Sequence, residues 1–76
     1  MSEPKPPLAD IPPGRYRHFK GATYVVVGMA RHSETEEPFV VYHPEGSGEL
    51  WVRPAAMWTE IVHRGDYDGP RFTKLP

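Results

Sequence analysis

The sequence predicts an all-β protein, either a small SH3-like antiparallel barrel that is partly open and contains five to six strands, or a strongly bent sheet. Three observations support this fold class. From Gly14 onward, short runs of β-branched and aromatic residues alternate with polar ones, which is the period-two pattern of strands. Glycine and proline residues separate these runs, and no stretch has the period of a long helix. A barrel also leaves few strand edges exposed, which favours it over a flat sheet.

The expected elements follow one another closely. Residues 15–19 alternate and end at a turn formed by Lys20 and Gly21. Residues 22–30 contain three successive valines and are apolar on both faces, as in a central strand, and Gly28 within them predicts a bulge. Further strands are expected at residues 39–43, 50–53, 58–64 and 71–75, with one helical or 3₁₀ turn at residues 54–57 and a loop at residues 65–70. The side chains expected to be mostly buried are Val25, Val27, Val41, Val52 and Ile61.

The length of 76 residues limits the chain to one domain. We expect this domain at residues 14–76, after a disordered leader at residues 1–13 that holds five of the ten prolines. The lack of cysteine excludes disulfides, thiolate zinc sites, iron–sulfur clusters and thiol catalysis. No run approaches the roughly 18 apolar residues of a membrane span, and the N-terminus lacks the apolar run of a signal peptide. A cytoplasmic protein without a membrane partner is therefore expected.

The formal net charge of −1 argues against sequence-independent binding to nucleic acid. The charges are nevertheless unevenly distributed. Residues 14–31 contain four basic side chains and no acid, whereas residues 32–49 contain five glutamates and no lysine or arginine. Two explanations are open: the two blocks pair across neighbouring strands, or they form a polarised surface.

Four motifs resemble those of a known family. Residues 16–21 read Y-R-H-F-K-G, residues 24–35 read Y-V-V-V-G-M-A-R-H-S-E-T, residues 40–42 read V-V-Y, and residues 50–54 read L-W-V-R-P, followed by Met57 and Trp58. In this order they resemble a group of short bacterial proteins known as domain of unknown function 1653, from residue 14 to about residue 75. The chain departs from the family pattern at Trp58, where phenylalanine is more usual, and in the turn at residues 44–49. The resemblance implies a family but no activity.

His32, Ser33 and Glu34 offer a base, a hydroxyl and a carboxylate in one segment. A hydrolytic triad needs converging side chains, whereas neighbours in an extended chain point to opposite faces, so only His32 and Glu34 could share a face. The alternative is that Ser33 and Thr35 hydrogen-bond the loop backbone. A minor catalytic role is kept as a third hypothesis, and the protein is expected not to be an enzyme. We also expect no metal and no cofactor, because the spacing of His18, His32, His43 and His63 matches no ligand motif.

The aromatic and arginine residues point to recognition. Strand alternation places Trp51 and Arg53 on the face of their strand opposite Leu50 and Val52. It places Tyr42 on the face of the preceding strand opposite Phe39 and Val41. If the aliphatic faces point inward, these three side chains are exposed, and exposed Tyr, Trp and Arg form binding hot spots. The alternative is that Trp51 closes one end of the barrel and Arg53 pairs with a carboxylate from residues 34–37. The candidate ligand-binding residues are Tyr42, Trp51, Arg53, Arg31, His32 and His18.

The sequence therefore predicts a recognition module that binds a peptide, a nucleotide or a nucleic-acid partner through an aromatic and arginine face. The alternative hypothesis is a homo-oligomeric or scaffolding subunit without a small ligand.

Overall fold

A computed structural model describes residues 11–76, in which seven strands and one helical turn follow the order β1 to β4, α1, and β5 to β7. The all-β class and the single helical turn are confirmed. One additional strand lies where a loop was expected, at residues 65–70, and Trp58 ends the helical turn instead of starting a strand. The bounds are β1 Gly14–His18, β2 Thr23–Arg31, β3 Pro38–Pro44, β4 Trp51–Pro54, α1 Ala55–Trp58, β5 Ile61–Arg64, β6 Tyr67–Pro70 and β7 Phe72–Lys74.

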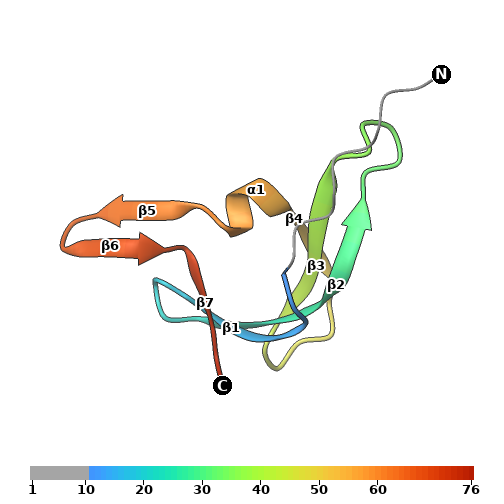
Figure 1. The fold of residues 1–76 in the computed structure, drawn as a ribbon. Coiled ribbons are helices and arrows are strands. Elements are labelled where there is room, and N and C mark those ends of the chain that lie inside the picture. Colours follow the sequence, from blue (N-terminus) through green and yellow to red (C-terminus); the bar gives the residue numbers. More distant parts are fainter. Residues whose placement is uncertain (1–10) are drawn as a thin grey trace.

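Five strands form one antiparallel sheet in the order β4-β3-β2-β1-β7, and β5 pairs with β6 in a separate ladder. The ends of the sheet, β4 and β7, do not pair, so the sheet does not close into a barrel, and the alternative of a strongly bent sheet is the one observed. The sheet is strongly bent, with α1 and the β5–β6 hairpin on its concave side (Figure 1). The pairing register shifts between Val26 and Gly28, which confirms the predicted bulge. Such a bulge bends a strand and increases its twist.

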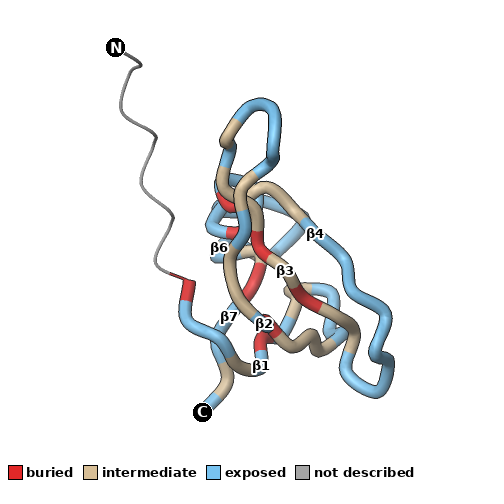
Figure 2. Tube along the Cα trace, turned by 90° about the vertical axis from the view of Figure 1, so that its right-hand side faces the viewer, coloured by how far each residue is buried: buried red, intermediate tan, exposed pale blue. Residues whose placement is uncertain are grey.

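The concave, inner face of the sheet carries the core. Trp58 of α1 stacks on Phe72 of β7, with ring centroids 3.7 Å apart and planes 3° from parallel. Tyr16 and Tyr42 meet the Trp58 ring edge-on, at centroid distances of 5.5 and 4.9 Å. The buried residues of the sheet are distributed over β1, β2, β3 and β7 (Figure 2). The core cluster consists of Ile11, Tyr16, Val26, Val40, Tyr42, Ala55, Trp58 and Phe72.

The prediction of which strand faces are buried is wrong. Val27, Val52 and Ile61 are 53%, 61% and 54% exposed, and Val25 and Val41 are only half-buried. Alternation correctly places Tyr42 on the face opposite Val41, and Trp51 on the face opposite Val52, but it does not say which face points inward. The inner face is decided by Trp58, an aromatic side chain from outside the sheet that buries about 150–250 Å².

Tyr42, which was expected to be exposed, is 4% exposed for the same reason. Its ring packs against Trp58, so it belongs to the core and not to a free surface.

The segment before β1 packs on the core. Ile11 is buried, and the Tyr16 hydroxyl donates a 2.8 Å hydrogen bond to the carbonyl of Pro12. Residues 1–10 of the predicted leader lie outside the described residues. Within the part that is described, no helix is long and apolar enough to cross a membrane.

Replacement of Trp58 by alanine is expected to lower the free energy of unfolding by about 3–5 kcal/mol, because it removes the ring on which Tyr16, Tyr42 and Phe72 converge. Urea unfolding followed by circular dichroism measures this loss. Met57→Ala, at an exposed neighbouring position, is the matched control and should change stability by less than about 1 kcal/mol. Equal losses in the two variants would contradict the assignment of Trp58 as the centre of the core.

Candidate functional site

Three predicted residues meet at the open end of the inner face. The register places His18 opposite Phe72, and Tyr42 opposite Trp51. The Tyr24 ring lies beside His18, Trp51 and Phe72, with centroid distances of 6.4, 6.2 and 5.9 Å. We call this group the inner-face site; it consists of His18, Tyr24, Trp51, Arg53 and Phe72.

Arg53 is the cation at the centre of this site. Its guanidinium carbon lies 5.4 Å from the centroid of the Phe72 ring, and its Nε donates a 3.4 Å hydrogen bond to the Tyr42 hydroxyl. No carboxylate within residues 11–76 pairs with it, so the alternative of an ion pair with residues 34–37 is not observed. Its two terminal nitrogens make no hydrogen bond to the described residues. Arg53 therefore presents planar donors beside an aromatic ring.

His18 adds a second donor. The backbone N–H of Lys20 donates to its Nδ1 at 3.1 Å, which places the proton of the neutral imidazole on Nε2. Burial lowers the pKa of His18, and the positive charges of Arg53, Arg71 and Lys20 lower it further. The ring is therefore neutral at pH 7, and its Nε2 N–H can donate to a ligand without adding charge.

Trp51 and Tyr24 provide the exposed aromatic surface of the site. Trp51 is 40% exposed, and its indole N–H donates a 2.9 Å hydrogen bond to the Glu49 carboxylate. That bond orients the ring but also places one acid at the border of the site. The Tyr24 ring is half-buried and tilted by 45° against Trp51. Together the two rings can stack on a planar group.

Arg71 lies next to the site and was missed by the sequence analysis, as were Tyr24 and Phe72. Its Nη2 donates to the Glu60 carboxylate, and its buried Nε has no hydrogen-bond partner in residues 11–76. The signal for Tyr24 was present, because the tight turn at Gly21 sets Tyr24 opposite Tyr16. The positions of Phe72 and Arg71 depend on the pairing of β7 with β1, which no local sequence pattern predicts.

Arg31 and His32 are not part of the inner-face site. Arg31 is the last residue of β2, about 23 Å along the strand from Tyr24 at the usual rise, and His32 follows it. Arg31 donates to the carbonyl of Glu36 at 3.0 Å, so it stabilises the hairpin at residues 32–37.

The His32 ring also organises this hairpin. Its Nδ1 accepts the backbone N–H groups of Glu34 and Thr35 at 3.1 and 3.3 Å. The Thr35 hydroxyl accepts the backbone N–H of Glu37, as the loop-backbone alternative predicted for it. The segment is thus occupied with turn contacts. Within residues 11–76 no three His, Asp or Glu side chains gather where a metal could bind.

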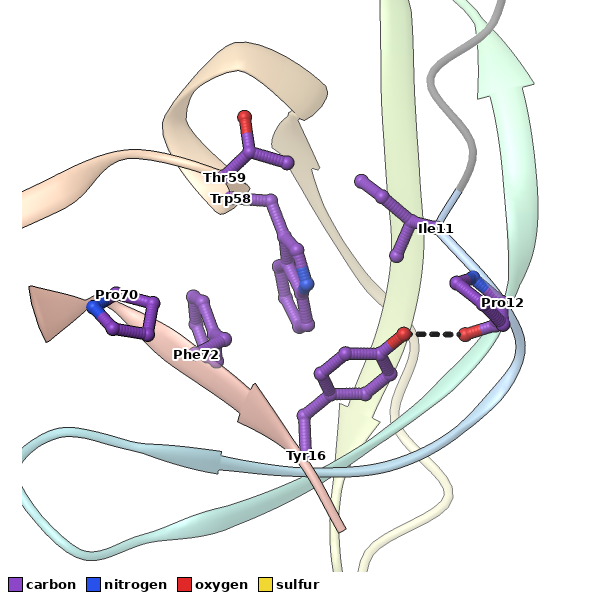
Figure 3. A pocket seen from close by; sticks show the side chains of 7 residues that line it. All are labelled: Ile11, Pro12, Tyr16, Trp58, Thr59, Pro70 and Phe72. Atoms are coloured by element: carbon purple, nitrogen blue, oxygen red, sulfur yellow. Dashed lines mark hydrogen bonds between the residues drawn. The ribbon is translucent and has the colours of Figure 1, made fainter.

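Two hollows flank the site. The first, about 270 Å³, lies next to the stacked rings of Trp58 and Phe72. Figure 3 shows the Trp58 indole nitrogen on the edge of the ring nearer Ile11 and Tyr16. This nitrogen is buried without a hydrogen-bond partner in residues 11–76, but the lining holds no charged group. The lining residues are Ile11, Pro12, Tyr16, Trp58, Thr59, Pro70 and Phe72.

The second hollow, about 300 Å³, is lined by Arg17, His18, Phe19, Tyr67, Thr73 and Leu75. Phe19 and Tyr67 stack there with centroids 5.3 Å apart, and the Arg64 guanidinium lies 6.0 Å from the Phe19 centroid. Because Arg17 also lines this hollow, His18 stands between two cationic and aromatic regions.

Comparison with known proteins agrees with the motif resemblance. The profile of the DUF1653 family, described as a protein of unknown function, matches residues 14–74. A crystal structure of a DUF1653 protein from Bordetella bronchiseptica is 38% identical, covers 87% of this chain and 88% of its own, and superimposes with a TM-score of 0.78. No curated protein matches the chain.

The lowered pKa of His18 predicts a pH-dependent stability. Below about pH 6.5 the unfolded chain binds a proton that the folded chain resists, so the free energy of unfolding falls as the pH falls through this range. Above that pH both states are neutral at this residue and the effect is absent. Glu45, whose pKa is lowered by its hydrogen bond from Arg15, loses its charge only at more acidic pH. Thermal unfolding between pH 7.5 and pH 5.5 should show the decline.

His18→Gln should reduce this decline. The same substitution at His43, on the outer face of the sheet, is the matched control. Equal slopes in the wild type and in His18→Gln would contradict the role assigned to His18.

Proposed function

Since the chain belongs to the DUF1653 family, whose description assigns no function, we propose from the inner-face site that it is a recognition module for a ligand that combines an anionic group with a planar ring. The observation that carries the proposal is Arg53, a half-buried guanidinium that lies on an aromatic ring and has no carboxylate partner in residues 11–76. Such a group has free donors for phosphate or carboxylate. His18 Nε2 supports it as a neutral donor.

Among the three ligand classes considered, a nucleotide fits best. Trp51 and Tyr24 offer aromatic surface at the border of the same site, and base–aromatic stacking contributes about 1–3 kcal/mol per base. A phosphate on the Arg53 side and a base on the Trp51 side would use both halves of the site at once. An extended nucleic acid fits less well, because the chain has a formal net charge of −1. A peptide carboxylate would engage Arg53 but would leave the rings without a partner unless it carried an aromatic residue.

Protonation should couple to this binding. A phosphate bound at Arg53 favours the charged form of His18, so phosphate binding should raise the pKa of His18.

Arg53→Gln should weaken binding of a nucleoside monophosphate about tenfold to a hundredfold, the equivalent of about 1.5–3 kcal/mol for a hydrogen bond to a charged group. The measurement is a chemical-shift titration of the labelled protein with nucleoside monophosphates, inorganic phosphate and a short peptide in parallel. Arg64→Gln, which removes a cation beside Phe19 instead of Phe72, is the matched control.

Three outcomes would decide against the proposal. Shifts that cluster at Phe19 and Tyr67 would place recognition in the second hollow. Binding of the peptide alone would exclude the nucleotide class. Unfolding of Arg53→Gln, together with unfolding of the conservative variant Trp51→Phe, would make these residues structural.

A further inference from the structure

The outer face of the bent sheet is apolar and open. Val41 of β3 pairs with Val52 of β4, and the bulge of β2, which contains Val27 and Gly28, lies opposite Val41, so the outer faces of three strands are continuous there. Val27 and Val52 are each more than half exposed (Figure 2 looks onto β2, β3 and β4). We call this surface the valine patch; it consists of Val25, Val27, Val41 and Val52.

A sheet normally buries at least one face against another layer, and this sheet has already buried its inner face against α1. Isolated exposed valines need no explanation, whereas a contiguous group in the middle of a sheet marks an interaction surface. The rim of the patch shows what kind of partner fits.

One end of the patch is basic. Arg15 pairs in register with Val25, and Arg17 with Thr23, which places both arginines on the outer face. Arg15 forms an ion pair with Glu45, with its Nε 2.6 Å from the carboxylate oxygen. Arg17 is exposed and has no ion-pair partner in residues 11–76.

The other end is acidic. The hairpin at residues 32–37 carries three glutamates, and the ladder continues into it because the His32 N–H donates to the Glu37 carbonyl at 2.9 Å. Alternation from β3 places Glu37 on the outer face with Val41. The cation at this end, Arg31, is engaged with the hairpin backbone.

We propose that the valine patch is the interface of a homodimer with a two-fold axis near Val27. Thr23, opposite Arg17, and His32, opposite Glu37, lie nearly equally far from Val27 along β2, four and five residues away. A second copy packed face to face in the antiparallel sense therefore brings the basic end of each protomer over the acidic end of the other, and valine meets valine between them. This self-complementarity is what an isologous interface requires. It favours a second copy over an unrelated partner.

Sedimentation equilibrium of the full chain across a concentration series tests the proposal. The expected mass is twice the 8.6 kDa of the chain. Val52→Lys should raise the dissociation constant about tenfold or more, because it places an unpaired charge within the apolar part of the interface. Ile61→Lys, at an equally exposed apolar position on β5, is the matched control and should leave the dimer intact.

A charge exchange tests the orientation. Arg17→Glu and Glu37→Lys should each weaken the dimer, and the double variant should recover much of the loss, because the reversed charges meet again across the axis. Failure of the double variant to recover would overturn the antiparallel arrangement.

If Val52→Lys does not fold, dilution of the labelled wild type provides the answer without a mutation. The methyl signals of the valine patch should shift on dilution, while those of the core residues Val26 and Val40 stay in place. A wild type that is monomeric at every concentration, or a dimer as sensitive to Ile61→Lys as to Val52→Lys, overturns the proposal.

Discussion

The stack of Trp58 on Phe72 is the interaction on which the rest of the structure depends. Trp58 follows β4 directly through the single turn α1, and Phe72 begins β7, so the two rings come from the two opposite edges of the sheet. Their contact at 3.7 Å brings these edges together although no backbone hydrogen bond joins β4 to β7. Arg53 of β4 reaches the Phe72 ring in the same way. The sheet is thus open in its hydrogen bonding, and side chains close it.

The same arrangement couples stability to the inner-face site. Phe72 has one face against Trp58, while the Arg53 guanidinium lies 5.4 Å from its centroid. A cation held by a buried ring loses little freedom when a ligand binds, so part of the entropic cost of binding is already met on folding. This arrangement has an electrostatic cost at His18. His18 must stay neutral beside Arg53 and Arg71, and this proximity to positive charge contributes to its lowered pKa.

Much of the fold could be predicted from local sequence because its signals are local. The turn at Gly21, the bulge at Gly28 and the face shared by Trp51 and Arg53 each depend on a few neighbouring residues. Alternation divides the residues of a strand between two faces, but it is the same pattern whichever face is buried. The buried face could therefore not be predicted. Only the docking of Trp58, a residue from beyond the strand, removes that symmetry.

For the candidate site too, the local features could be predicted and the contacts between distant segments could not. Trp51 and Arg53 were predicted together because they are two residues apart on one strand. Their contact with Phe72 could not be predicted, since it requires the chain to return after 19 residues and pair β7 with β1. Arg31 and His32 were also assigned to the site from the sequence, as residues at the border of the face that carries Tyr42, Trp51 and Arg53. In the fold the length of β2 separates them from it.

The run of valines at residues 25–27 does not indicate which face of the strand is buried. Three successive apolar residues in a strand cannot all point to one side, so the pattern requires burial on both faces without ranking them. In a single chain the inner face takes Val26, which is 2% exposed, and strand alternation points Val27 outward, where it is 53% exposed. A strand with this pattern is typical of the centre of a two-sided structure. A single sheet covered by one helical turn buries only one of its two faces. The run of valines therefore leaves apolar side chains on the outer face of β2, and this exposure follows from the sequence as well as from the fold.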